Sequence, residues 1–175
     1  MLVSILLFLG FCFSYADKEV YPKELSFINV PIDIHWSNKD SHVLIDMCSL
    51  NYSRHSENPA LTPFFSDLTE SCSSVYSIYF EEIETVYNSS RAQIASPTGF
   101  VFHSARCGST LVANILAAES NNLVYSEPKI PLKIFALCRR YGCSDERRAH
   151  MIRTIVAAMW SGPSKRHSAM FIKYT

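Results

Sequence analysis

Residues 99–128, GFVFHSARCGSTLVANILAAESNNLVYSEP, decide the fold of this chain. The stretch begins with an apolar run rich in β-formers, residues 99–102, and continues through a small, polar turn, residues 103–110. Apolar residues then recur at helical spacing, and residues 123–125 form a second short apolar run. The order strand, glycine-containing turn, helix and strand predicts one βαβ unit.

The turn before the predicted helix has the residue types of an anion-binding site. A helix begins with unpaired backbone N–H groups and the positive end of its dipole. Gly108 lets a ligand approach the backbone, and Ser109 and Thr110 add hydroxyl donors. Arg106 adds a permanent cation whose planar fork suits oxyanions. The sequence therefore predicts a phosphate or sulfate site at this helix N-terminus.

Glu127 follows the second predicted strand and is the candidate proton acceptor. The two strands of a βαβ unit are parallel, so their carboxyl ends meet at one edge of the sheet, where ligands bind. We expect Glu127 to lie near residues 106–110. A carboxylate beside an anion site weakens anion binding but can take a proton from an incoming nucleophile.

These residues resemble a known family. The motif HSARCGSTL at residues 103–111, followed by SEP at residues 126–128, is similar to the 5′-phosphosulfate loop and the following Glu-Pro of P-loop sulfotransferases. The resemblance covers roughly residues 99–135. It implies a three-layer P-loop-type α/β fold with a central parallel sheet. It also implies that 3′-phosphoadenosine 5′-phosphosulfate (PAPS) is the sulfonate donor and that no metal is needed.

The resemblance also assigns roles to single residues. It implies that PAPS is bound by Arg106, Cys107, Gly108, Ser109 and Thr110. Glu127 takes the place of the catalytic base in protein-tyrosine sulfotransferases, and Arg106 would stabilise charge on the leaving oxygen. The acceptor would be a hydroxyl or amine, and a protein tyrosine, a carbohydrate and a small molecule all stay open.

Other interpretations of the loop stay open. The chain could be a non-catalytic α/β fragment that binds an anion or a partner. A P-loop kinase is disfavoured, because the lysine of a Walker A loop is missing from Gly108-Ser109-Thr110. A cysteine phosphatase is also disfavoured, because its loop places cysteine first and arginine last, whereas here Arg106 precedes Cys107.

The N-terminus predicts entry into the secretory pathway. Residues 2–13 are almost wholly apolar but short for a membrane span, and Ser14 and Ala16 fit a cleavage site. We expect residues 1–16 to be a signal peptide, with an uncleaved anchor as the alternative. If the leader is removed, we expect a lumenal or secreted protein without a stable membrane span. Two Asn-X-Ser sequons, at Asn51 and Asn88, fit this route and are expected on exposed loops.

The cysteines predict two disulfides and one free thiol. The chain has six cysteines, of which Cys12 lies in the leader, so an odd number remains. The preferred pairing joins Cys48 to Cys72 and Cys138 to Cys143. Cys107 stays unpaired, because a bridge there would distort the anion loop. The alternative is that all the thiols are reduced and buried.

The composition predicts a folded domain of ordinary size. Apolar residues make up 48% of the chain and charged residues 18%, which is enough for a core. The formal net charge of zero gives no support for binding to nucleic acid or to a membrane surface. Residues 17–97 form an N-terminal region of uncertain structure, with a strand at 43–45, a strand or helix at 75–80 and a loop at 51–63.

Residues 98–175 are expected to form the N-terminal part of the sulfotransferase-like domain. A helix with a basic end is predicted at 130–140, and Ser144 is the expected N-cap of a second helix. A third strand is predicted at 169–172, with Lys173 at its carboxyl end. The chain ends at Thr175, before the Arg and Ser that bind the 3′-phosphate in the family. We therefore expect an incomplete domain, truncated at its C-terminus.

Overall fold

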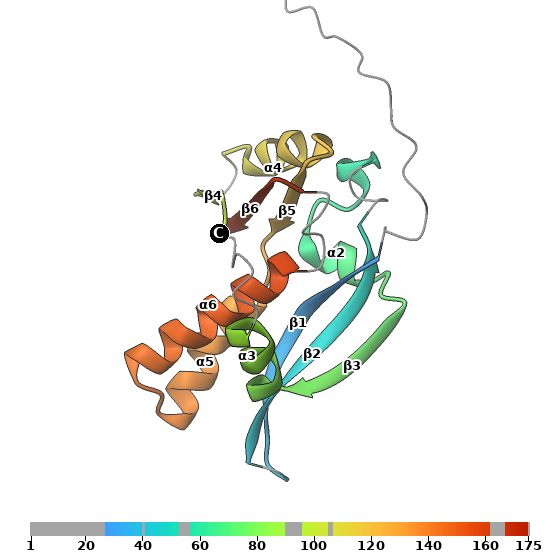
Figure 1. Cartoon of the computed structure of the whole chain (residues 1–175). Helices are drawn as coiled ribbons and strands as arrows, with labels where there is room; N and C mark the ends of the chain where they lie inside the picture. The colour runs from blue at the N-terminus through green and yellow to red at the C-terminus, as the bar shows by residue number, and fades with distance from the viewer. Residues whose placement is uncertain are drawn as a thin grey trace, which may run out of the picture.

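The computed structural model describes residues 27–39, 41–52, 57–89, 96–104, 107–161 and 167–174. The predicted leader and Arg106 lie outside these residues. The described chain is a mixed α/β structure with two three-stranded sheets and flanking helices (Figure 1). The prediction of an α/β fold with a parallel sheet is therefore confirmed.

The first sheet is antiparallel and lies in the N-terminal region. It contains β1 (Phe27–Ser37), β2 (His42–Asn51) and β3 (Ser74–Tyr79) in that order. The predicted strand at 43–45 lies within β2, and the segment at 75–80 is a strand that runs directly into the helix α3 (Phe80–Ser89). The sequence did not predict β1, an edge strand with a register shift between Pro31 and Asp33. Proline is tolerated at such edges and bulges because it cannot donate to the ladder.

The second sheet is parallel and contains the predicted βαβ unit. It consists of β4 (Gly99–Phe102), β5 (Asn122–Ser126) and β6 (Ala169–Tyr174), in the order β4-β6-β5. The crossover helix is α4 (Ser109–Ala118). All three strands were predicted, but β4 and β5 do not pair directly, because β6 lies between them. The last strand of the described chain therefore stands at the centre of the sheet.

The remaining helices pack beside the sheets. The short helices η2 (Pro59–Leu61) and α2 (Phe65–Thr69) follow β2, whereas α5 (Ile130–Tyr141) and α6 (Asp145–Ser161) follow β5. Gly142 ends α5 in the left-handed conformation, and the Ser144 hydroxyl accepts a hydrogen bond from the Arg147 N–H. The two predicted helices and the cap at Ser144 are confirmed.

The two faces of the parallel sheet pack against different neighbours. Val124 and Phe171 pack against the buried face of α4, which Ala113 and Ala117 form. The alternate residues of β5 and β6 join the main core: Leu123, Tyr125, Met170 and Ile172. That core also contains buried residues of β1 and β2, so the two sheets on either side of the predicted boundary at 97/98 share one core.

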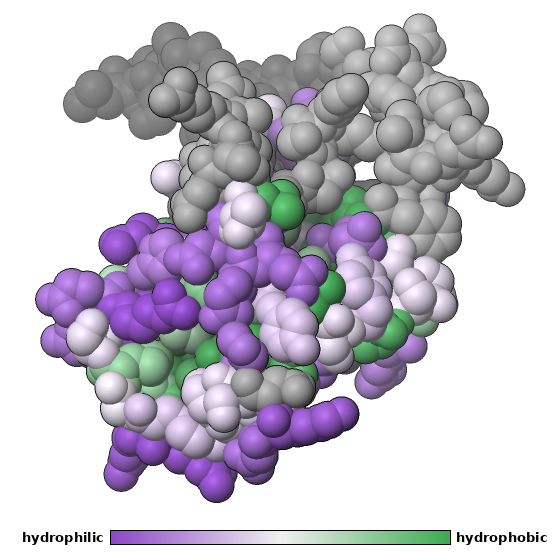
Figure 2. Space-filling view, turned by 60° about the horizontal axis from the view of Figure 1, so that its bottom comes forward, coloured by the Kyte–Doolittle hydropathy of each residue, from purple (hydrophilic) through white to green (hydrophobic). Residues whose placement is uncertain are grey.

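Several large apolar side chains are exposed on α4 and β4. Leu111 and Ile115 of α4 are mostly exposed, and Phe102 of β4 is 74% exposed. Phe100, Phe102 and Tyr174 stack with ring centroids 6.0–6.3 Å apart. By contrast, the face that comes forward in Figure 2 is mostly hydrophilic, with smaller hydrophobic areas between. The parallel sheet thus exposes apolar side chains both on its edge strand β4 and on its crossover helix α4.

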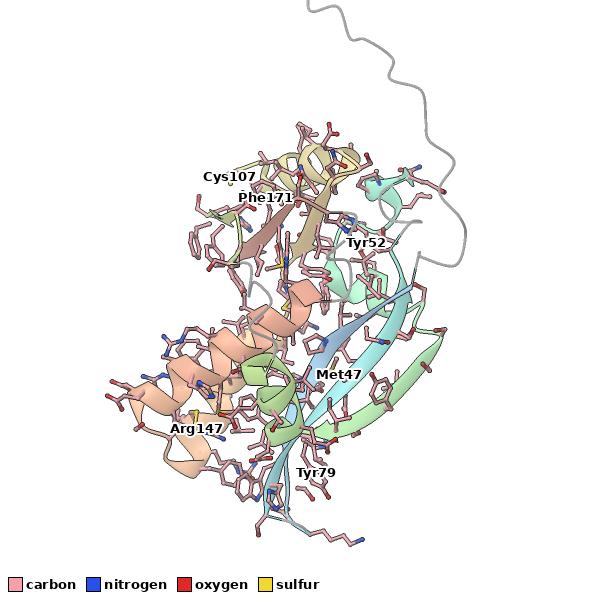
Figure 3. All side chains as sticks on the ribbon, in the orientation of Figure 1. Met47, Tyr52, Tyr79, Cys107, Arg147 and Phe171 are labelled. Atoms are coloured by element: carbon pink, nitrogen blue, oxygen red, sulfur yellow. A yellow bond between two sulfur atoms is a disulfide. The ribbon has the colours of Figure 1, made fainter. Side chains whose placement is uncertain are left out.

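Tyr52 links the antiparallel sheet to the parallel sheet. Its side chain is only 3% exposed and lies between the end of β2 and β5 (Figure 3). The hydroxyl accepts a hydrogen bond from the Val124 N–H (2.7 Å) and donates one to the Val124 carbonyl (3.3 Å). Tyr52 therefore occupies backbone groups on the edge of β5 that does not face β6.

Two disulfides connect the predicted cysteine pairs. Cys48 bonds to Cys72, and Cys138 bonds to Cys143. Cys107 is free, as predicted, and it is exposed. Disulfides of this kind form and persist in oxidising compartments, such as the secretory lumen and the extracellular space.

The sequons do not lie on loops as expected. Asn51 is the last residue of β2, and Asn88 lies in the last turn of α3, so the prediction of loop positions was wrong. The described part of the chain contains no helix that is both long and apolar enough to cross a membrane.

We predict that Tyr52→Phe destabilises the fold by about 1–3 kcal/mol, the cost of leaving buried polar groups unpaired. Burial raises the pKa of Tyr52, so the folded state keeps the phenol neutral. The stabilisation is fully present below the ordinary tyrosine pKa of about 10. It is lost as the pH rises above that value, because the Tyr52 phenol ionises first in the unfolded chain. Urea unfolding on both sides of this pH would measure the effect. A gap between parent and variant that widens at high pH would contradict it.

Candidate functional site

The carboxyl ends of the three parallel strands meet at one edge of the sheet. Lys173 of β6 pairs in register with Val101 of β4 on one side and with Ser126 of β5 on the other. Because alternate residues of a strand share a face, Lys173 and Ser126 lie on the same face as Phe171 and Val124, the face that α4 covers. The strand order thus places Lys173 between the predicted anion loop, which follows β4, and Glu127, which follows β5.

Lys173 and Glu127 form the central ion pair of this edge. The Lys173 Nζ lies 2.6 Å from the Glu127 Oε1, and the Lys173 side chain is only 1% exposed, whereas that of Glu127 is 33% exposed. The Glu127 N–H also donates to the Lys173 carbonyl at 2.8 Å. Main-chain and side-chain contacts therefore both fix Glu127 against the end of β6.

The same lysine connects Glu127 to the predicted anion loop. Its Nζ donates to the Thr110 Oγ1 in the first turn of α4 at 3.4 Å. The expectation that Glu127 lies near this loop is therefore met for Thr110, through Lys173. Among the described residues, one buried ammonium bridges the end of β5 and the start of α4.

Glu127 has an unfavourable backbone conformation. Its φ of 59° lies in the left-handed region, which residues other than glycine rarely adopt. It also precedes Pro128, and a residue in that position normally has an extended backbone. Such conformations cost about 1–3 kcal/mol and cluster at functional sites. The surrounding structure holds this carboxylate in place against its local preference.

His103 contributes a buried nitrogen to the same cluster. It directly follows β4, and its side chain is 8% exposed, with Nε2 3.5 Å from the Glu127 Oε1. Neither this Nε2 nor the buried hydroxyl of Ser126 has a hydrogen-bond partner among the described residues. Buried polar atoms are normally paired, so two unsatisfied ones beside Glu127 fit a place that receives a ligand.

The N-terminus of α4 lies at this edge and has no side-chain cap. Gly108 is the N-cap with a φ of 84°, a left-handed conformation that glycine adopts easily, and it has no side chain to cap the helix. Cys107 and Gly108 are exposed, whereas Ser109 is buried. Figure 3 shows Cys107 at the start of α4. The structure does not describe Arg106, so the position of its guanidinium stays a prediction.

A residue of the N-terminal region also reaches the site. The Phe64 ring, which precedes α2, lies 5.3 Å from the Lys173 Nζ, within the range of a cation–π contact. The described N-terminal region therefore covers part of the candidate site with an aromatic ring.

Sequence reasoning missed three residues of the cluster. Lys173 was placed at the end of a strand but received no role, because the sequence does not show that β6 lies between β4 and β5. His103 belongs to the quoted motif, yet nothing in the sequence shows that its nitrogen is buried beside Glu127. Phe64 gave no signal, since its contact depends on how the two sheets pack.

Neither a metal-binding group in the described residues nor a similar known protein points to a function. No group of three or more His, Cys, Asp or Glu side chains gathers there in a way that could hold a metal ion. Comparison of the chain with protein-family models, with curated proteins and with solved structures finds no match. Function is therefore inferred from the geometry of the site and from the motif.

We predict that Glu127→Gln destabilises the fold more than Lys173→Met. The first change leaves a buried ammonium without its counter-charge, whereas the second leaves a partly exposed carboxylate that water can solvate. A hydrogen bond to a charged group contributes about 1.5–3 kcal/mol. Urea unfolding of both variants and of the double variant would measure the coupling. Losses that add to within about 0.5 kcal/mol would contradict a direct interaction.

Proposed function

We propose that this chain is part of a lumenal or secreted sulfotransferase, which moves a sulfonate group from PAPS to a hydroxyl or amine acceptor. The observation that carries the proposal is the Lys173 bridge between Glu127 and Thr110 at the carboxyl edge of the parallel sheet. The motif HSARCGSTL with SEP supports the choice of donor. The two disulfides support the compartment.

The site offers the donors that a phosphosulfate group needs. The first N–H groups of α4 and the positive end of its dipole favour an anion, and the Lys173 ammonium lies beside Thr110 in the first helical turn. When PAPS donates its sulfonate group, negative charge grows on the phosphate oxygen that leaves. Fixed donors and cations aimed at such an oxygen are the main source of catalysis in group transfer of this type. Lys173 and Arg106 would stabilise that charge.

Glu127 is the group that would accept the proton of the acceptor. It is one third exposed, so a substrate hydroxyl can reach it, and its carboxylate pairs with Lys173 on the inner side. A positioned base must lie within hydrogen-bond reach of the proton that it takes. The strained backbone at Glu127 supports this role, because a residue with only a packing role has no need of that conformation.

The exposed apolar residues support a larger P-loop-type domain. Strand β4 pairs only with β6 among the described strands, and its Phe100 and Phe102 form an exposed aromatic stack with Tyr174. Parallel sheets are usually covered on both faces. We propose that further elements of a three-layer domain cover this face, which would also supply the 3′-phosphate site.

A second candidate is an anion-binding module without turnover. The ion pair with Lys173 favours it, since Glu127 could serve only to neutralise a buried lysine. In that case the first turn of α4 would hold an anion, and no proton would be transferred.

Nucleotide binding tests the donor. We expect 3′,5′-adenosine bisphosphate, the product of sulfonate transfer, to bind in calorimetric titration and ADP to bind more weakly. Arg106→Ala should weaken binding about tenfold to a hundredfold, because its charged hydrogen bonds contribute about 1.5–3 kcal/mol. Cys107→Ala is the matched control, because a thiol is a weak donor. Equal losses in both variants would count against Arg106 as an anion ligand, and tighter binding of ADP would point to a kinase.

Turnover separates the enzyme from the binding module. Glu127→Gln should reduce release of the bisphosphate from PAPS by roughly 10²–10⁴-fold, the usual contribution of a general base. Tyrosine peptides, carbohydrates and phenols would serve as acceptors, and the assay temperature should lie below the melting temperature of the variant. Near-normal turnover in a folded Glu127→Gln variant would contradict the catalytic role of Glu127. No turnover in the parent, with bisphosphate still bound, would favour the anion-binding module.

A further inference from the structure

The hydrogen on the His103 ring can be located from its neighbours. The His103 Nδ1 lies 2.9 Å from the Ser104 carbonyl oxygen, and a carbonyl oxygen only accepts hydrogen bonds. The hydrogen is therefore assigned to Nδ1. In a neutral imidazole the other nitrogen, Nε2, then has a lone pair and no hydrogen.

That lone pair faces a carboxylate. The His103 Nε2 lies 3.5 Å from the Glu127 Oε1 and has no hydrogen-bond partner among the described residues. Two acceptors that face each other in a buried place repel unless a proton lies between them. When neither the His103 Nε2 nor the Glu127 Oε1 carries a proton, one proton can be accepted between them.

Lys173 biases where that proton goes. Its Nζ lies 2.6 Å from the same Glu127 Oε1 that faces His103. A nearby cation favours the ionised carboxylate over the neutral acid. The Glu127 Oε1 thus lies between the Lys173 ammonium and the His103 Nε2.

We propose that His103 is the second proton acceptor of the site and relays the proton that Glu127 removes from the acceptor. This inference rests on the proposed sulfotransferase function. The O–H bond of the acceptor breaks as a Glu127 O–H bond forms. That bond then breaks as the Nε2–H bond of His103 forms. The products are an imidazolium, which releases its proton to water, and a Glu127 carboxylate paired with Lys173.

A purely structural role explains His103 less well. A buried histidine that supports a turn normally has both nitrogens hydrogen-bonded, yet among the described residues only Nδ1 has a hydrogen-bond partner. The charged groups that the structure places around the ring, in its described part, are Glu127 from the end of β5 and Lys173 from β6. His103 acts through Glu127 and is therefore a positioning residue for proton transfer.

The tautomer of His103 tests the geometry without any activity. Long-range ¹⁵N–¹H NMR of the folded chain, with His103→Gln to assign the signal, should show the neutral ring with its hydrogen on Nδ1. Glu127→Gln should change the His103 nitrogen shifts, whereas His42, an exposed histidine 3.9 Å from Glu81, should keep its shifts. A neutral His103 with its hydrogen on Nε2 would overturn the proposal.

The pH profile of turnover tests the relay itself. His103→Gln should reduce kcat by at least about tenfold and should change the acid limb of the pH profile of kcat, because Glu127 then remains as the only proton acceptor of the pair. The control His42→Gln should leave both unchanged. Turnover in the parent with an identical profile in His103→Gln would overturn the relay and leave the sulfotransferase proposal intact. No bisphosphate binding or turnover in the parent would overturn the proposed function and the relay with it.

Discussion

The placement of β6 between β4 and β5 is the constraint on which the candidate site depends. In this order, Lys173 lies in register with Ser126 and reaches both Glu127 and Thr110. A lysine that is 1% exposed must have a counter-charge, because removing an ammonium from water is costly. Glu127 provides that charge, and its backbone is held in the left-handed conformation. The ion pair thus links the fold of the sheet to the position of the proposed base.

The N-terminal sheet contributes to the same region. Tyr52 binds the edge of β5 through the backbone of Val124, and Phe64 lies over the ammonium of Lys173. The disulfide between Cys48 and Cys72 connects β2 to the segment before β3, so it helps to hold this half of the chain together. Both sheets therefore contribute to the site. The aromatic ring that covers its lysine belongs to the N-terminal region, outside the motif.

Local signals in the sequence predicted most of the parallel sheet and its helices. Apolar runs marked β4, β5 and β6, Ser144 marked the start of α6, and the odd cysteine count with the anion loop led to the two disulfide pairs. The sequence could not predict β1, because Pro31 interrupts its run. It also gave no strand order, so the role of Lys173 and the burial of His103 were missed. These features arise from contacts between segments far apart in the chain, which no local pattern encodes.

The central claim is that the start of α4 and Lys173 form one anion site beside Glu127. A crystal structure of the chain with 3′,5′-adenosine bisphosphate tests it most directly. The account predicts that the 5′-phosphate accepts hydrogen bonds from backbone N–H groups of residues 107–110 and lies next to the Lys173 Nζ, with the Glu127 carboxylate facing the open side. A phosphate bound elsewhere, with the Lys173–Glu127 pair unchanged and the first turn of α4 unoccupied, would contradict it.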